Sequence, residues 1–279
     1  MKFDLLFLCH EKDKEILKKS IEYAKKNVVE YRKIFVVSKE NYFPNRKDIT
    51  FIDEKKYPFS KKDIEKYAPK NRVGWYYQQF LKLYFFEVAE KEVLDNLLII
   101  DADTMFIRKT KFFEKEIPLY NVDECYHEPY YKILEKLFGF GQQNKKYSGT
   151  THHMLFQKKY INEIFNLAKE EFWIYIMKNI DPKLRSGLSE QELYFNYMLK
   201  YHPEKIKIRK LKFIDFPSTS KNWIKIFKIL GYSYIASHDY LQEEKFPKIK
   251  SFFIEVLKSL KIKGKLKRIY NKFGFEGFR

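Results

Sequence analysis

A short apolar run that ends in two aspartates, residues 96–104 (Asn-Leu-Leu-Ile-Ile-Asp-Ala-Asp-Thr), places the strongest constraint on the fold of this chain. Aliphatic residues followed at once by charge are typical of a buried parallel strand that reaches the sheet edge at its carboxyl end. Residues two apart in an extended chain point to the same side, so we expect Asp101 and Asp103 to present their carboxylates together. Open α/β sheets bind ligands at this edge.

Two oxygen ligands without a nearby thiolate favour Mg²⁺ or Mn²⁺, with substrate phosphates and water at the remaining positions. The alternative is an incidental acidic turn, because about 0.5 Asp-x-Asp tripeptides are expected by chance in a chain of this composition. The position of Asp101 and Asp103 directly after an aliphatic strand favours the metal and phosphate role.

Strand-like and helix-like segments alternate along most of the chain, which predicts an α/β fold with a mostly parallel sheet flanked by helices. Strands are expected at residues 3–9, 33–38, 49–53, 97–100, 151–156, 205–212 and 231–237. Helices are expected at residues 13–26, 75–92, 158–170, 172–179, 190–201 and 222–230. The less regular region 120–149 is interpreted as an elaboration that faces substrate.

Length and composition agree with a globular α/β protein. A chain of 279 residues with 45% hydrophobic content suffices for one large domain or two small ones. Cys9 and Cys125 are its only cysteines, no apolar stretch reaches the length of a membrane span, and residues 1–4 lead into a strand without a signal-peptide pattern. A reducing cytoplasm is therefore expected.

The net charge of +18 raises the question of a polyanionic partner. Residues 248–279 contain ten Lys or Arg against two Glu, and their apolar residues fall near one helical stripe. An apolar stripe beside a basic face predicts that segment 241–279 binds an anionic membrane surface peripherally, at the inner face of the membrane. The alternative is that the stripe packs against the domain; no nucleic-acid partner is expected.

Candidate substrate-binding residues follow the first strand and lie on the helix that precedes the Asp101 strand. Cys9, His10 and Lys12 would lie at the same sheet edge as Asp101 and contact a nucleotide, unless they only form an exposed loop and helix start. The helix places its amides and lysine on the face opposite the core, where they would bind a nucleotide or sugar or else be solvated. The candidates are Arg72, just before the helix, and Trp75, Gln78, Gln79 and Lys82 on it.

Three further candidates come from later in the chain. At most one of the adjacent His152 and His153 would face a site, because neighbours on a strand point to opposite faces, and we select His153. Ser189 and Glu192 match a capping box, which leaves Glu190 available to point into a cleft. His238 follows the last expected strand and is a candidate third metal ligand.

The order of these features resembles the GT-A class of nucleotide-sugar glycosyltransferases. It is most similar to a bacterial family with a Gly-Trp-Tyr-x-Gln-Gln-x-x-Lys-Leu helix before its Asp-x-Asp strand, here residues 74–83 and 101–103. His152-His153-Met154, Ser189-Glu190 and Ser237-His238 complete the likeness. The resemblance covers roughly residues 1–240 and implies one GT-A-like, Rossmann-like catalytic domain followed by the basic helical tail 241–279.

The resemblance implies a metal-dependent transfer of sugar from a nucleotide-diphosphate donor, with a UDP-sugar favoured, to a glycan or lipid-linked acceptor of bacterial surface polysaccharide. Mn²⁺ or Mg²⁺ would be held by Asp103 and His238, with Asp101 near the ribose or on the metal through water. Glu190 would act as general base on the acceptor hydroxyl.

The stereochemical course and the reaction class both have alternatives. Glu190, Gln191 and Glu192, followed by Asn196, also resemble the Asp-Gln-Asp-x-x-Asn pattern of retaining galactosyltransferase-like enzymes, with one extra residue before Asn196. Glu192 is therefore kept as a second catalytic candidate, and Gln191 as a substrate-binding candidate. A metal-dependent nuclease or phosphotransferase is the alternative function, in which Asp101, Asp103 and Glu190 would hold two metals against nucleic acid.

Overall fold

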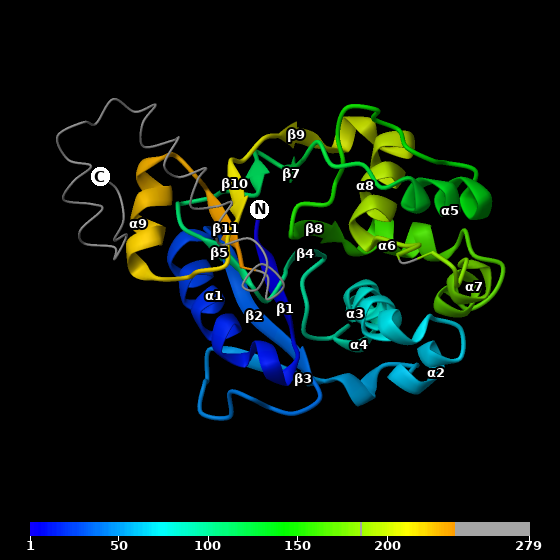
Figure 1. Ribbon diagram of the computed structural model, residues 1–279, viewed down its shortest axis with the longest axis horizontal. Helices are drawn as coiled ribbons and strands as arrows, with labels where there is room; N and C mark the ends of the chain where they lie inside the picture. The colour runs from blue at the N-terminus through cyan, green and yellow to red at the C-terminus, as the bar shows by residue number, and fades with distance from the viewer. Residues whose placement is uncertain (185, 238–279) are drawn as a thin grey trace, which may run out of the picture.

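The computed structural model describes residues 1–184 and 186–237 of the chain (Figure 1). Its strands are β1 (Phe3–Cys9), β2 (Tyr31–Ser38), β3 (Ile49–Asp53), β4 (Asn96–Ile100), β5 (Thr104–Phe106), β6 (Phe113–Glu114), β7 (Ile117–Asn121), β8 (His153–Gln157), β9 (Lys207–Arg209), β10 (Phe213–Asp215) and β11 (Tyr234–Ala236). Its α-helices are α1 (Lys14–Asn27), α2 (Lys61–Glu65), α3 (Val73–Leu83), α4 (Phe85–Val88), α5 (Glu128–Phe138), α6 (Lys158–Phe165), α7 (Phe172–Asn179), α8 (Glu190–Tyr201) and α9 (Lys221–Ile229).

The central sheet has the strand order β3-β2-β1-β4-β8. Its first four strands are parallel, and β8 runs antiparallel to β4. Two three-stranded sheets, β10-β11-β5 and β6-β7-β9, lie beside it and contain both parallel and antiparallel pairs. The α/β class is therefore confirmed, but the strands form three mixed sheets and not the single mostly parallel sheet that the sequence predicted.

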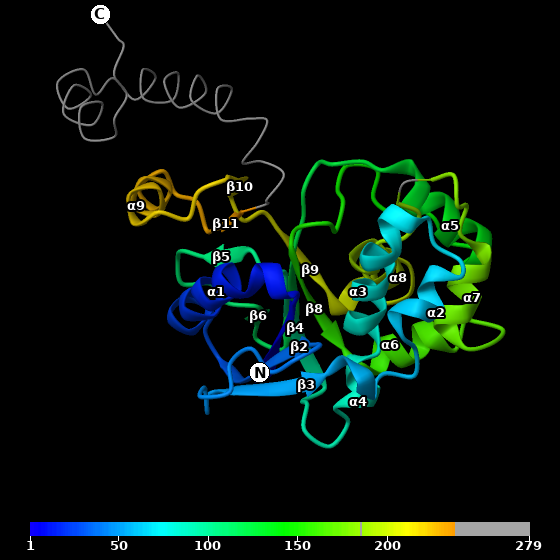
Figure 2. The same ribbon diagram turned by 60° about the horizontal axis from the view of Figure 1, so that its bottom comes forward.

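Strand β1 is apolar without interruption from Leu5 to Cys9 because both of its faces are covered (Figure 2). Phe3, Leu5 and Phe7 pack in one buried cluster with the apolar residues of α1. Leu6 points to the opposite face, into the larger cluster formed with α3 and α8. The alternation follows from the two-residue period of a strand and makes α1 and the α3–α8 pair the two outer layers.

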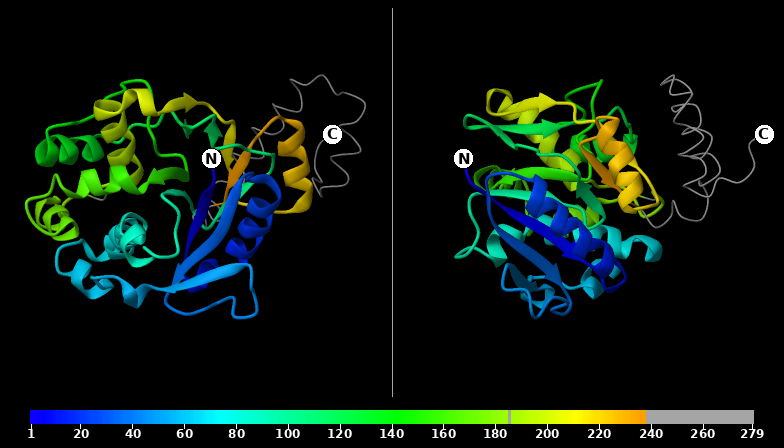
Figure 3. Two further views of the ribbon diagram at one scale, coloured as in Figure 1. Left: turned by 180° about the vertical axis from the view of Figure 1, so that it is seen from behind. Right: turned by 90° about the vertical axis from the view of Figure 1, so that its left-hand side faces the viewer.

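A third, smaller core lies where α9 packs on the β10-β11-β5 sheet (Figure 3). Phe227 of α9 and Ile235 of β11 are fully buried there, and Tyr23 of α1 packs against the same cluster. This sheet joins the central one through the short turn between β4 and β5, which contains Asp101 and Asp103.

Several element boundaries differ from those expected from the sequence. The helix predicted over 75–92 is divided at Tyr84 into α3 and α4; the hydroxyl of Tyr84 is bonded to Glu171 and to the Trp173 amide. The irregular region 120–149 contains α5, which ends at Gly139 in the left-handed conformation. The strand predicted over 205–212 is present but shorter, as β9, and the separate strand β10 follows it. The predicted tail, residues 241–279, lies outside the described residues.

Within residues 1–184 and 186–237, no helix combines the length and the apolar character that crossing a bilayer requires.

A buried carboxylate anchors the amino end of the central sheet. Asp4 of β1 is fully buried, and its two oxygens accept hydrogen bonds from Arg32 at 2.9 Å (Nε) and 2.6 Å (Nη2). The Leu94 amide donates a third, at 2.8 Å. This charge-assisted, bidentate contact ties β1 to β2 and to the turn before β4.

We expect Asp4→Asn to lower the free energy of unfolding by about 2–3 kcal/mol, because the amide cannot reproduce the charge-assisted bonds of the buried carboxylate. Urea denaturation measures this change. Glu114→Gln is the matched control, since the Glu114–Lys207 pair is exposed on both sides and its loss should leave stability nearly unchanged. Equal losses in the two variants would contradict the special role of Asp4.

Candidate active site

Asp101 and Asp103 lie in a tight turn at the carboxyl end of β4, next to the central strand β1. The Thr104 amide donates to the carbonyl oxygen of Asp101 at 3.0 Å and closes the turn. The expectation that an extended backbone aligns the two carboxylates is therefore wrong, because the chain turns between β4 and β5. The turn lies where the strand order reverses between β1 and β4, which is the usual ligand position in open α/β sheets.

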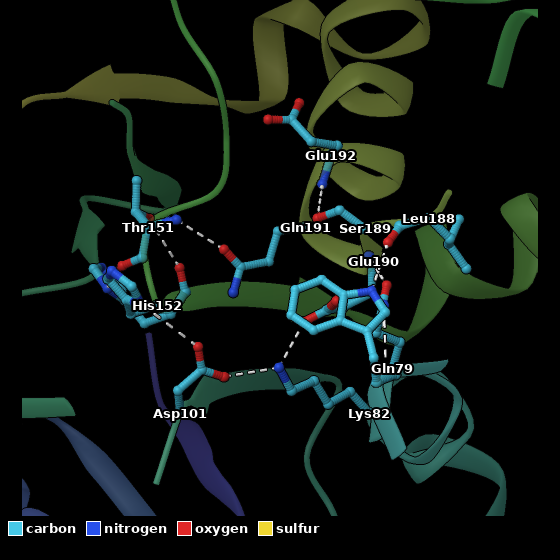
Figure 4. A network of polar contacts seen from close by, with 12 residues as sticks. Gln79, Lys82, Asp101, Thr151, His152, Leu188, Ser189, Glu190, Gln191 and Glu192 are labelled. Atoms are coloured by element: carbon cyan, nitrogen blue, oxygen red, sulfur yellow. Dashed lines mark hydrogen bonds and ion pairs between the residues drawn. The ribbon is translucent and has the colours of Figure 1, made fainter. Parts of the chain in front are cut away.

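The ammonium group of Lys82 lies between two carboxylates from distant parts of the chain (Figure 4). Its Nζ is 2.7 Å from Oδ1 of Asp101 and 2.7 Å from Oε1 of Glu190. Burial disfavours the charged amine, but the attraction of both carboxylates outweighs it and raises the pKa of Lys82 above its ordinary value. Lys82 is therefore a permanent cation inside the site and not part of a solvated helix face.

Glu190 begins α8 and is only 5% exposed. Its amide donates to Oε1 of Gln79 at 2.9 Å, and the side-chain amide of Gln79 donates to the Trp75 carbonyl at 3.3 Å. Glu190 is thus not used by the helix cap, as expected, but its carboxylate is not free, because it is held by Lys82. Gln79 is 1% exposed and positions the start of α8 through its bond to the Glu190 amide. Gln78 is half-buried.

Glu192 has a different role from the one that the capping pattern predicted. Ser189 does cap α8, accepting from the Glu192 amide at 3.2 Å. The Glu192 carboxylate, however, accepts hydrogen bonds from the Ser148 hydroxyl and from the Gly149 amide, the latter at 3.0 Å. Gly149 passes so close to α8 that an added Cβ would lie 2.7 Å from Phe195. Glu192 therefore fixes the loop before β8 and does not reach back over the helix start.

Gln191 holds the same loop one step further along. Its Oε1 accepts the Thr151 amide at 2.9 Å (Figure 4). Gln191 is 4% exposed and the Thr151 side of this contact is fully buried. This contact positions the backbone that leads into His152. Binding of substrate by Gln191 stays a prediction.

The choice between the two adjacent histidines was wrong. Residue His152, not His153, faces the acidic turn: its Nδ1 is 3.8 Å from Asp101 and its Nε2 is 3.2 Å from Asp215. His152 has a φ of 64°, a left-handed conformation that non-glycine residues adopt at an energetic cost. His153 begins β8 and points into the core between Phe106 and Tyr234.

The residues expected after β1 are divided between core and surface. The Cys9 thiol is buried in the core that α1 covers, and burial, with the negative charge of Asp13, raises its pKa to about 12. Cys9 therefore does not face a nucleotide. His10 is exposed at the end of β1, where its Nδ1 accepts the Lys12 amide at 3.4 Å, and the Lys12 side chain is 64% exposed.

Arg72 and Trp75 lie at the start of α3, on the side of Glu190. The Trp75 indole donates to the carbonyl oxygen of Leu188 at 3.3 Å, and the Arg72 guanidinium lies 5.7 Å from the indole ring. Both side chains are half-buried. They are near the loop that leads into Glu190.

No group of three or more His, Cys, Asp or Glu side chains within residues 1–184 and 186–237 is arranged to hold a metal ion. The predicted third ligand, His238, lies outside the described residues. The residue before it, Ser237, donates its amide to the carbonyl oxygen of Asp103 at 3.0 Å. Asp101 and Asp103 still supply the oxygen ligands that Mg²⁺ or Mn²⁺ prefers, since such ions often use one or two carboxylates and complete their coordination with substrate phosphates.

Sequence reasoning missed His152 as the neighbour of Asp101, Asp215 as the second partner of His152, and the loop 148–151. The pairing of β10 with β11, and of β11 with β5, is what brings Asp215 to this place. The one available signal was the His-His dipeptide, whose side chains must point to opposite faces.

Comparison of the chain with models of known protein families gives no match, and no curated protein matches it either.

We expect the burial of His153 to make the protein sensitive to mild acid. Burial, with the positive charges of Arg209 and His152, lowers the pKa of His153 to about 3, whereas an unfolded histidine takes up a proton near 6.5. Because the unfolded state then binds more protons, the free energy of unfolding should fall by up to about 1.4 kcal/mol per pH unit as pH decreases below that value.

His153→Asn provides the test, because the amide can still donate to the Thr151 carbonyl that the ring Nδ1 contacts at 2.9 Å. The difference in unfolding free energy between wild type and variant, measured by urea denaturation from about pH 7 to pH 5, should shrink with decreasing pH. A pH-independent difference would mean that His153 is protonated equally in both states.

Proposed function

We propose that the chain is a metal-dependent glycosyltransferase that transfers a sugar from a nucleoside-diphosphate donor to a hydroxyl of a glycan or lipid-linked acceptor. The observation that carries this proposal is the meeting of Asp101 and Glu190 at the Lys82 ammonium, at the strand-order reversal of the central sheet. That arrangement puts an acidic turn for a metal-bound diphosphate beside a second acid for the acceptor.

The arrangement of the central sheet supports a GT-A-like fold for this part of the chain. Four parallel strands in the order β3-β2-β1-β4 are followed by the antiparallel β8, and the Asp-x-Asp turn follows β4. A nucleotide would lie across the carboxyl ends of β1 and β4, where His10 and Lys12 are exposed.

Asp103 is the carboxylate we assign to the metal, together with the donor diphosphate and with His238, which lies outside the described residues. Mn²⁺ or Mg²⁺ bound there would neutralise charge on the leaving diphosphate. Asp101 Oδ1 is engaged by Lys82, which favours an indirect role for Asp101, toward the ribose or toward a metal-bound water.

Glu190 is the residue we assign to the acceptor. Its carboxylate would take the proton of the acceptor hydroxyl as that oxygen bonds to the anomeric carbon, and the bond from this carbon to the diphosphate oxygen breaks. Lys82 would hold Glu190 in place for this step through the 2.7 Å contact. The assignment applies to an inverting reaction; a retaining course stays an alternative.

The nuclease or phosphotransferase alternative has less support. It requires Asp101, Asp103 and Glu190 to share two metal ions, but the position between Asp101 and Glu190 is taken by the Lys82 ammonium. Peripheral binding of an anionic membrane through residues 241–279 stays part of the proposal, and this segment lies outside the described residues.

The donor can be identified by thermal unfolding in the presence of nucleotide sugars, with and without Mn²⁺, because a specific ligand raises the stability of the folded state. UDP with Mn²⁺ is the first probe. We expect Asp103→Asn to fold normally and to lose the Mn²⁺-dependent part of UDP binding in calorimetry, because the amide is a poorer ligand for a hard cation.

Asp95→Asn is the matched control for this measurement. Asp95 is exposed just before β4, at the opposite end of the strand from the acidic turn, so its replacement should leave UDP binding intact. An unchanged Mn²⁺ effect in Asp103→Asn would overturn the metal assignment.

We expect Glu190→Gln to retain donor binding and to lower turnover by about 10²–10⁴-fold, as loss of a general base does. Its amide oxygen can still accept from Lys82, so the fold should be preserved. Glu192→Gln, in contrast, should lower the free energy of unfolding by about 1–3 kcal/mol through weakened bonds to the loop 148–150. Steady-state kinetics together with thermal unfolding separate the two effects, and normal turnover in Glu190→Gln would refute its role.

A further inference from the structure

The loop that leads into Glu190 is held from two sides by aromatic side chains. On the α3 side, the Trp75 indole donates to the Leu188 carbonyl at 3.3 Å, and the Gly187 amide donates to the Tyr76 hydroxyl at 2.8 Å. On the α5 side, the His127 ring donates its Nε2 proton to the Ser186 carbonyl at 2.8 Å. The residues at the starts of α3 and α5 therefore flank this loop, and we call them the rim.

The α5 side of this rim exposes an aromatic ring to solvent. Tyr126 is 62% exposed and stacks on Tyr131, with ring centroids 5.3 Å apart and planes at 25°. His127 meets Tyr130 edge-on at 4.4 Å. Tyr126 is the most exposed of the large aromatic side chains in the described chain, and the ring beneath it fixes its orientation. A fixed, exposed ring is suited to stacking against a flat apolar face of a ligand.

Tyr130 connects this rim to the catalytic candidate. Its pKa is raised by burial and further by the negative charge of Glu190, while the positive charge of Arg72 acts in the opposite direction. Tyr130 therefore lies within the electrostatic field of both groups.

Arg72 contributes a positive charge that has no acidic partner within residues 1–184 and 186–237. Its guanidinium lies over the Trp75 ring at 5.7 Å, and its Nε is buried without a hydrogen-bond acceptor in that part of the chain. A buried donor without an acceptor is destabilising, and guanidinium groups pair best with carboxylates and phosphates. Arg72 as a whole is half-buried, so an anionic group of a ligand would pair with its guanidinium.

We propose that the rim formed by Arg72, Trp75, Tyr126, His127 and Tyr130 is the acceptor subsite, and that it binds an acidic sugar. The sugar ring would stack on the exposed aromatic face while its acid group pairs with Arg72, and a hydroxyl would face Glu190. The identification as an acceptor subsite rests on the proposed function; binding of an acidic sugar at the rim does not.

The Trp75 indole provides a direct reporter of this binding. The chain contains three tryptophans, so its two-dimensional proton–nitrogen spectrum should contain three indole signals, and Trp75→Phe identifies the one that belongs to Trp75. We expect titration of the full chain with glucuronic acid to shift this signal. Glucose, which differs by lacking the carboxylate, should bind at least about tenfold more weakly, the effect of losing one charge-assisted pair.

Glucose 1-phosphate distinguishes a phosphate-bearing sugar from a carboxylate-bearing one, since the tighter of the two acidic probes identifies the acid group that the rim accepts.

Arg72→Gln should reduce the preference for acidic probes, and Arg108→Gln, a change of the same charge at an exposed position outside the rim, should not. Tyr126→Ala should weaken all three probes. Its control is Tyr201→Ala, because Tyr201 is also exposed but lies at the far end of α8, about 16 Å from Glu190 along the helix.

Saturating UDP and Mn²⁺ test the assignment to the acceptor. Persistence of the Trp75 shift in their presence supports an acceptor subsite, whereas displacement by UDP would place the rim in the donor site and overturn the proposal. The absence of a Trp75 shift with both acidic probes would also overturn it. If UDP does not bind at all but the acidic sugars do, the glycosyltransferase proposal fails and the rim remains a binding site for acidic sugars.

Discussion

The buried ammonium of Lys82 is the interaction on which the rest of the candidate site depends. It joins the turn after β4 to the start of α8 through α3, and its positive charge offsets the repulsion between two carboxylates in a site of low dielectric. Removal of the ammonium would leave both carboxylates without their cation, and loss of a partner from a buried ion pair destabilises a protein by about 3–5 kcal/mol. Lys82, Asp101 and Glu190 therefore constrain one another, and the position of each is determined by the other two.

The first turn of α8 extends this constraint to the opposite wall of the site. Its successive residues have separate partners: Glu190 pairs with Lys82, Gln191 holds the Thr151 amide, and Glu192 holds the loop at Ser148 and Gly149. The first turn of α8 thus determines the positions of both the Glu190 carboxylate and the loop that leads into His152. The left-handed backbone of His152 persists because this loop is fixed at several points.

The proposed separation of a donor subsite from an acceptor subsite is based on the same contacts. The carboxyl edge of β1 and β4, with the acidic turn, is suited to a nucleoside diphosphate and its cation. The aromatic rim at the starts of α3 and α5, with Arg72, contacts the loop that leads into Glu190 and is the subsite that we propose for a second, acidic substrate. Glu190 is linked to the acidic turn through Lys82 and follows the loop that the rim contacts, as its proposed role in transfer requires.

The sequence by itself determined the α/β class, most strands of the central sheet and the start of α8, because these follow from local apolar periodicity and from helix capping by Ser189. It also located Asp101, Glu190 and Lys82 as separate candidates. Only the tertiary structure decided that these three meet, since Lys82 and Glu190 are 108 residues apart and no local pattern encodes such a contact. The same holds for His152 and Glu192, whose roles depend on which face of β8 is buried and on how closely Gly149 approaches α8. The spacing of apolar residues predicts which face of a helix or strand is buried. The partners of a buried polar group, in contrast, depend on long-range packing that brings donors and acceptors together.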